Sequence, residues 1–199
     1  MSATFGDHVS LNRVFIIDNL DSFTYNIVHG LVSAGAMVDV CLAHKVDLEL
    51  LETHSPDLLV VSPGPGSPND ACVSLAAIKR FAGKIPIFGI CLGMQCMAVA
   101  YGGIVGPGRE PVHGKVSGIV HDGKGIFSDL PKRIMVGRYH SLHVKEVPPC
   151  MKVTARCDNG IPMAIQHRWL RMVGVQFHPD SFLSDDGSAI LKHVIQGNF

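Results

Sequence analysis

The sequence lacks the charge excess, the paired cysteines and the leader segment that mark several classes of protein. Seventeen Lys and Arg residues balance seventeen Asp and Glu residues in a chain of 199. Without a basic excess we expect no binding to nucleic acid. None of the six cysteines forms a C-x-x-C pair, and residues 1–12 lack the basic start of a secretory signal. These features predict free thiols and a cytoplasmic location.

One uncharged stretch, from Ile85 to Gly108, is long enough to suggest a membrane span. Prolines and glycines interrupt it at 86, 89, 93, 102, 103 and 107. Such residues break a long helix into short pieces. We therefore expect a buried strand followed by a buried helix, and no membrane association.

Strands and helices alternate in the first half of the chain. Apolar, branched runs predict strands at 13–18, 37–42, 57–62 and 85–90, and helices are expected at 23–34, 71–81 and 92–100. The second half predicts short strands at 115–120, 133–136, 152–155, 163–167 and 173–177, then a helix at 186–195. This order favours an α/β fold with an open, mostly parallel central sheet, helices on both faces and antiparallel additions at one edge. We expect an N-terminal extension, 1–12, and one domain, 13–199.

A cysteine follows the fourth predicted strand in the sequence Gly89-Ile90-Cys91-Leu92-Gly93. G-x-C-x-G at a strand-to-helix junction is the cysteine form of a nucleophile elbow. The turn projects the sulfur from the sheet at a helix N-terminus, which favours the thiolate, and offers the Leu92 amide to an oxyanion. Gln95 lies one turn further along the same helix face. The alternative is that Cys91 is a small core residue.

A histidine follows the last predicted strand and could serve as the base for such a nucleophile. Pro179 favours an extended backbone at His178, so Asp180, two residues on, faces the same side. His-Pro-Asp thereby combines a base with an orienting carboxylate. The alternative is a turn with a solvated histidine and a capping aspartate.

The third unusual segment is the turn Pro63-Gly64-Pro65-Gly66 after the third predicted strand. The two glycine amides can point at a bound oxygen, whereas proline has no amide hydrogen to donate. No G-K-[ST] follows, so it is not a phosphate-binding loop. A plain surface turn is the alternative. All three segments follow strands, and ligands bind beyond the carboxyl ends of the strands in an open parallel sheet.

Six strings, in order along the chain, resemble the class I glutamine amidotransferases, in particular the glutaminase subunits (component II) of anthranilate synthase and aminodeoxychorismate synthase. They are I-D-N-L-D-S-F-T-Y-N (17–26), S-P-G-P-G-S-P (62–68), G-I-C-L-G-M-Q (89–95), H-G-K (113–115), R-Y-H-S-L (138–142) and G-V-Q-F-H-P (174–179). The first string is the most selective and points to the branch that uses chorismate.

The resemblance implies hydrolysis of the L-glutamine side-chain amide by a catalytic triad of Cys91, His178 and Asp180. The amides of Gly66 and Leu92 would form the oxyanion hole. The glutamine site would be lined by Gly64, Pro65, Gln95, Ser141 and Leu142. Ammonia would pass to a larger subunit that binds chorismate and Mg²⁺, with no metal or cofactor in this chain.

One position departs from the family, which has Glu where this chain has Asp180. The aspartate carboxylate reaches about 1.5 Å less far from the backbone. The bond to His178 would therefore lengthen, run through a water or be restored by a backbone shift.

Other functions stay open at this point. A free-standing γ-glutamyl hydrolase would explain the triad but not the first string, and Asp180 alone suggests a catalytically weak regulatory subunit. The chain does not choose between tryptophan and folate synthesis, although we favour anthranilate. His140 and His143 have H-x-x-H spacing, but no nearby carboxylate or cysteine completes a metal site.

Overall fold

Within residues 10–199, which the computed structural model describes apart from the side chains of 109–113, nine strands form one sheet. Their order is β2-β1-β3-β4-β9-β8-β7-β5-β6. The strands are β1 (Arg13–Asp18), β2 (Met37–Leu42), β3 (Leu58–Val61), β4 (Ile87–Ile90), β5 (Ile104–His121), β6 (Arg133–Glu146), β7 (Met151–Cys157), β8 (Pro162–His167) and β9 (Met172–Val175).

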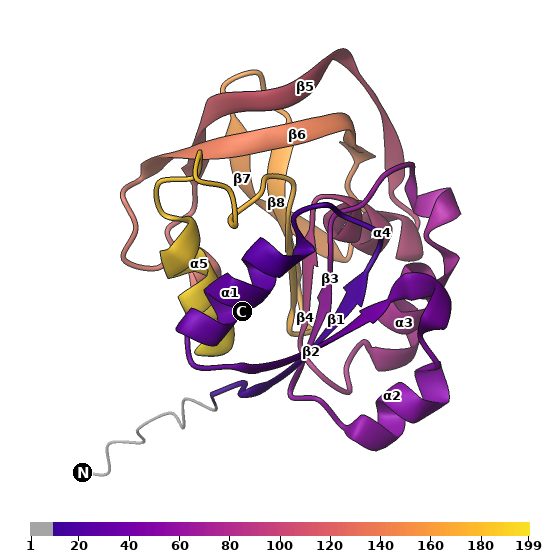
Figure 1. The fold of residues 1–199 in the computed structure, drawn as a ribbon. Helices are drawn as coiled ribbons and strands as arrows, with labels where there is room; N and C mark the ends of the chain where they lie inside the picture. The colour runs from indigo at the N-terminus through magenta and orange to yellow at the C-terminus, as the bar shows by residue number, and fades with distance from the viewer. Residues whose placement is uncertain (1–9) are drawn as a thin grey trace, which may run out of the picture.

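The sheet has a parallel half and an antiparallel half. The strands β2, β1, β3, β4 and β9 pair in parallel. From β9 onward, each pair through β8, β7, β5 and β6 is antiparallel. This confirms the predicted mostly parallel core with antiparallel additions at one edge, and Figure 1 shows β5 and β6 crossing over that end.

Helices cover both faces of the parallel half (Figure 1). One face carries α1 (Thr24–Ser33) and α5 (Gly187–Ile195), and the other carries α2 (Leu48–His54), α3 (Cys72–Phe81) and α4 (Leu92–Ala100). Alternate residues of β3 supply the two cores: Leu58 and Val60 pack toward α1 and α5, Leu59 and Val61 toward α3 and α4. Burial on both faces is why these strands read as continuous apolar runs.

Two features of the fold differ from the sequence prediction. The helix α2 was not expected, yet Asp47 caps it by accepting hydrogen bonds from the amides of Glu49 and Leu50. The strands β5 and β6 are much longer than predicted. Their ladder contains register shifts, including one between Pro107 and Val112, and the glycines and prolines there conceal the strand in the sequence.

The uncharged stretch from Ile85 to Gly108 contains the expected strand and helix, β4 and α4, and then the start of β5, which was not expected there. No helix of the described chain is long and apolar enough to span a membrane. All six cysteines are free thiols.

Candidate active site

The carboxyl ends of the parallel strands bring the three unusual segments to one edge of the sheet. Pro63 follows β3, Cys91 follows β4 directly, and His178 lies three residues beyond β9. Cys91 and His178 line the same cavity of about 420 Å³, together with Pro63, Gly64, Pro65, Tyr139 and the loop residues Leu20, Asp21, Ser22 and Phe23. The two proposed reacting groups therefore open onto one space.

The turn at Cys91 has the strained backbone of a nucleophile elbow. Its φ of 53° is unusual for a non-glycine residue. A Cβ at Gly93 would overlap the carbonyl oxygen of Val61, and one at Gly89 would lie 2.7 Å from the Gly93 carbonyl carbon. Both flanking glycines are thus required by close backbone contacts, and they set Cys91 at the start of α4.

Cys91 is buried and held from β9. Its amide donates to the carbonyl of Val175 over 2.8 Å, and the Gln176 side-chain amide donates to its sulfur over 3.5 Å. Gln176 also accepts from Gln95 Nε2 over 3.2 Å. A chain of amides therefore connects α4, β9 and the thiol in the buried interior.

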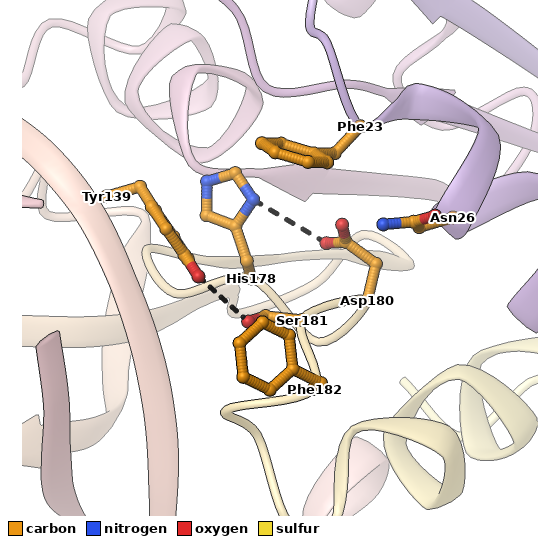
Figure 2. A pocket seen from close by; sticks show the side chains of 7 residues that line it. All are labelled: Phe23, Asn26, Tyr139, His178, Asp180, Ser181 and Phe182. Atoms are coloured by element: carbon orange, nitrogen blue, oxygen red, sulfur yellow. Dashed lines mark hydrogen bonds and ion pairs between the residues drawn. The ribbon is translucent and has the colours of Figure 1, made fainter. Parts of the chain in front are cut away.

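His178 is fixed by β6. Its amide donates to the Gly137 carbonyl over 3.0 Å, and Ser184 Oγ donates to its carbonyl over 2.6 Å while accepting from the Gly137 amide. The Tyr139 ring meets the imidazole edge to face, with centroids 5.1 Å apart. The Tyr139 hydroxyl lies 3.1 Å from Ser181 Oγ, as Figure 2 shows. These contacts fix the backbone of His178 and place the Tyr139 ring against its imidazole.

Asp180 faces the imidazole, but at a distance longer than a hydrogen bond. His178 Nδ1 and Asp180 Oδ1 are 3.6 Å apart, and both side chains are at most 4% exposed. Within the described residues, neither His178 Nε2 nor Asp180 Oδ1 has a hydrogen-bond partner. Burial lowers the pKa of His178, whereas Asp180 and Cys91 together raise it further, to about 10. Asp180 and Cys91 therefore both favour the protonated imidazole.

A second carboxylate, Asp21, also borders the cavity. Burial raises the pKa of Asp21 above its ordinary value, and the nearby His178 charge and the Phe23 amide offset only part of this rise. Nearby Asp18 is buried and braces the loop by accepting from the Leu20 amide and the Thr24 hydroxyl, both over 2.9 Å. The site thus gathers negative charge around one imidazole.

The Pro-Gly turn is locked to the β1–α1 loop. Asn19 donates its amide to Ser62 Oγ and its side-chain nitrogen to the Ser62 carbonyl, over 2.9 and 3.1 Å. Gly64 packs so closely on Asn19 that a Cβ there would overlap it. Gly66 has a φ of 79°, which glycine adopts without strain. The loop can therefore present amides without losing its shape.

The remaining predicted substrate residues lie outside the lining of this cavity. Leu92 lines an adjacent cavity of about 320 Å³, which Pro65 also borders. Gln95 is buried and donates to the Leu142 carbonyl over 3.0 Å, whereas Gly66 and Ser141 are exposed. The side chain of His113 lies outside the described residues.

His140 braces the segment that carries Ser141 and Leu142. Its Nδ1 lies 2.9 Å from the Leu142 carbonyl, and its Nε2 accepts from Arg138 over 3.0 Å. Burial and Arg138 lower its pKa to about 4, which keeps the ring neutral. Among the described side chains, no group of three His, Cys, Asp or Glu could hold a metal.

Comparison with known proteins decides the family. The family described as "Glutamine amidotransferase class-I" matches residues 15–196. This chain belongs to the class I glutamine amidotransferases. It is 47% identical over 185 residues to "Aminodeoxychorismate/anthranilate synthase component 2" of Bacillus subtilis (strain 168), covering 92% of this chain and 95% of that protein. It is 43% identical over 186 residues to the "Multifunctional tryptophan biosynthesis protein" of Pichia angusta, covering 92% of this chain.

The chain spans only 51% of the length of the Pichia protein. Among solved structures, a "putative gmp synthase" chain from Thermoplasma acidophilum matches with a TM-score of 0.83 and 22% identity. The match covers 93% of this chain and 92% of that one. At this identity the likeness shows the fold alone, and it agrees with the predicted sheet architecture.

Two residues of this amidotransferase site had no role in the sequence prediction, although both lie in the strings that carry the resemblance. Gln176 follows β9 directly and precedes His178 by two positions, so the alternation of side chains along an extended segment could have indicated a shared face. Tyr139 carried no such signal, because its contact with His178 comes from two segments 39 positions apart.

Proposed function

We propose that this amidotransferase is the glutaminase subunit of a two-component synthase, delivering ammonia to a larger chorismate-binding subunit. The observation that carries this is the one cavity that joins the strained Cys91 elbow to His178. The names of the relatives from Bacillus subtilis and Pichia angusta support the synthase assignment.

In the proposed reaction, Cys91 Sγ attacks the side-chain carbonyl carbon of glutamine. His178 transfers a proton to the departing nitrogen, so the C–N bond breaks and ammonia leaves a γ-glutamyl thioester. The Leu92 and Gly66 amides would stabilise the oxyanion. His178, now neutral, then takes a proton from water, which hydrolyses the thioester to glutamate; release of the Cys91 sulfur and the reprotonated imidazole restores the starting site.

Substrate recognition is proposed to involve the segments on both sides of the elbow. Gly64 and Pro65 border the reacting cavity. The connection between Gln95 and the Leu142 carbonyl places α4 beside the Ser141–Leu142 segment. Glutamine would extend from Cys91 toward that segment. The positive imidazole then lies beside the scissile amide, where it can donate a proton.

The exposed apolar side chains near the cavity are an argument for a partner subunit. Leu20, Phe23, Tyr25 and Phe182 are all more than half exposed. Leu20 and Phe23 line the cavity, Phe182 lines the smaller pocket beside His178, and Tyr25 follows Phe23 by two positions. Exposed apolar side chains near a functional opening are typical of an interaction surface. We infer that the large subunit, which would bind chorismate and Mg²⁺, covers this surface and receives ammonia there.

We favour anthranilate synthesis, and hence the tryptophan pathway, as the reaction served. The Pichia relative is named for tryptophan biosynthesis, and the Bacillus relative carries both synthase names. The second candidate is therefore a subunit of aminodeoxychorismate synthase in folate synthesis, or one shared by both enzymes. The choice is a property of the large subunit.

The test combines labelling with isolation of the partner. A glutamine-analogue diazoketone should label Cys91, with Cys91→Ala as the control, and the co-purifying chain should enhance labelling and glutamine hydrolysis. If Cys91 is not labelled, the result would instead favour the hypothesis of a catalytically weak regulatory subunit. Full activity without any partner would indicate a free-standing hydrolase.

The partner surface has its own test. Tyr25→Ala should weaken binding of the large subunit while leaving labelling of Cys91 in the isolated chain unchanged. Unchanged affinity would refute the assignment of this surface to the interface.

A further inference from the structure

A second, smaller cavity lies on the Asp180 side of the imidazole. Its volume is about 70 Å³, whereas a buried water needs roughly 10–15 Å³ on the same scale. It has room for water. Figure 2 shows the side chains that line it, namely Phe23, Asn26, Tyr139, His178, Asp180, Ser181 and Phe182.

This cavity contains a carboxylate that needs orientation. Asp180 Oδ1 is buried, has no hydrogen-bond partner within the described residues and lies 3.6 Å from His178 Nδ1. Buried polar atoms of this kind are rare in folded proteins and call for an explanation. An orienting carboxylate without a fixed position would be a poor support for the imidazole.

Asn26 is the neutral amide that faces this carboxylate. Figure 2 shows its side-chain nitrogen directed across the cavity at Asp180. Its backbone amide donates to the Phe23 carbonyl over 2.9 Å, which holds the residue in the first turn of α1. The two hydroxyls that line the cavity, those of Tyr139 and Ser181, already lie within hydrogen-bond distance of each other.

We propose that Asn26 is a positioning residue. Its side-chain nitrogen would bond a water in this cavity, and that water would bond the Asp180 carboxylate and hold it toward His178 Nδ1. This proposal rests on the proposed glutaminase function for its catalytic consequence. A neutral donor suits the role because it orients a carboxylate without cancelling its charge. The charge of Asp180 remains available to the imidazole.

The proposal makes a prediction about the length of the side chain at position 180. A glutamate at 180 would extend the carboxylate by one methylene, far enough to meet Nδ1 directly. The water and Asn26 would then be dispensable. Dependence on Asn26 should therefore appear only with the shorter side chain, which a double-mutant cycle measures.

The experiment compares Asn26→Ala in the unchanged chain and in Asp180→Glu, using the full chain with its co-purified partner. In the Asp180 background, we expect kcat for glutamine hydrolysis to fall about tenfold with little change in KM, which is the effect of a lost bond to a charged group. In the Asp180→Glu background the loss should be less than about twofold. Asn12→Ala, an exposed asparagine remote from the site, is the matched control.

A second measurement does not depend on glutamine turnover. The rate at which iodoacetamide alkylates Cys91, followed against pH, reports the charge state of the Cys91–His178 pair, on which Asp180 and Asp21 also act. Asn26→Ala should move the upper limb of this profile to lower pH, and Asn26→Ser, which retains a donor, should restore part of the shift.

Equal losses in both backgrounds, or no loss in either, would overturn the proposal, as would an unshifted alkylation profile. If Asn26→Ala does not fold, Asn26→Leu, which removes the donor at a similar volume, carries the same comparison. If the unchanged chain hydrolyses no glutamine, the proposed function fails. The alkylation profile still tests the positioning of Asp180 in that case.

Discussion

His178 Nδ1 lies 3.6 Å from Asp180 Oδ1, whereas charge-assisted hydrogen bonds between such groups are about 2.7–2.9 Å long. The pair is held at this distance by two rigid supports. The His178 backbone is bonded to Gly137, and Ser184 ties the following turn to the same residue of β6. At this distance the carboxylate still raises the pKa of His178, although the contact is longer than a good hydrogen bond.

Lengthening the carboxylate should therefore improve the site. Asp180→Glu is expected to hydrolyse glutamine with a kcat at least equal to that of the unchanged chain, because the extra methylene allows a direct hydrogen bond to Nδ1. Asp180→Asn, the control that removes the charge, should lose about tenfold or more. Steady-state glutaminase assays decide this, and abolished turnover in Asp180→Glu would contradict the role of Asp180.

The side-chain amide of Gln176 should increase the reactivity of the Cys91 sulfur. Gln176→Leu keeps a similar volume but removes the donor to Cys91 Sγ and the acceptor for Gln95. We expect labelling of Cys91 by a glutamine diazoketone to slow about tenfold. Gln166→Leu, on β8 and without either contact, is the control. Equal labelling rates in the two variants would show that the amide has no effect on the nucleophile.

The parts of this site that could be predicted are those carried by local geometry. The Cys91 elbow needs only glycines two positions away. Asp180 does lie beside His178, but not through the extended backbone that was expected: residues 178–181 form a turn in which the Ser181 amide donates to the His178 carbonyl over 3.2 Å. The contact of Gln176 with Cys91 spans 85 positions and depends on how β9 pairs with β4. The 3.6 Å distance between His178 Nδ1 and Asp180 Oδ1 exceeds a hydrogen bond by less than an ångström. Tertiary packing sets a difference of this size, and a residue pattern does not predict it.

The elbow glycine should be intolerant of any side chain. Gly93→Ala places a Cβ against the Val61 carbonyl oxygen, so α4 must shift away from β3. We expect a loss of about 1–3 kcal/mol in the free energy of unfolding, measured by urea denaturation. Gly106→Ala is the matched control, because its Cβ would meet only the flexible Lys145 side chain at 3.4 Å. Similar stability for both variants would contradict the close packing of the elbow.

The charge on His178 should make stability fall at alkaline pH. Its pKa is raised to about 10 from an ordinary 6.5, with the Asp180 carboxylate among the causes. A raised pKa means that the folded chain binds the proton more tightly than the unfolded chain does. The stabilisation is therefore complete below pH 6.5 and is lost as the pH rises toward 10, by at most about 1.4 kcal/mol per pH unit.

Other thiols and hydroxyls also titrate in this range, so the comparison must be with a variant. Asp180→Asn removes the carboxylate that holds the proton, and its unfolding free energy should decline less steeply between about pH 7 and pH 10. Urea denaturation at each pH unit gives the two slopes. Parallel slopes would mean that Asp180 does not hold the His178 proton, and the base would then have to depend on Asp21 or Cys91 for its charge.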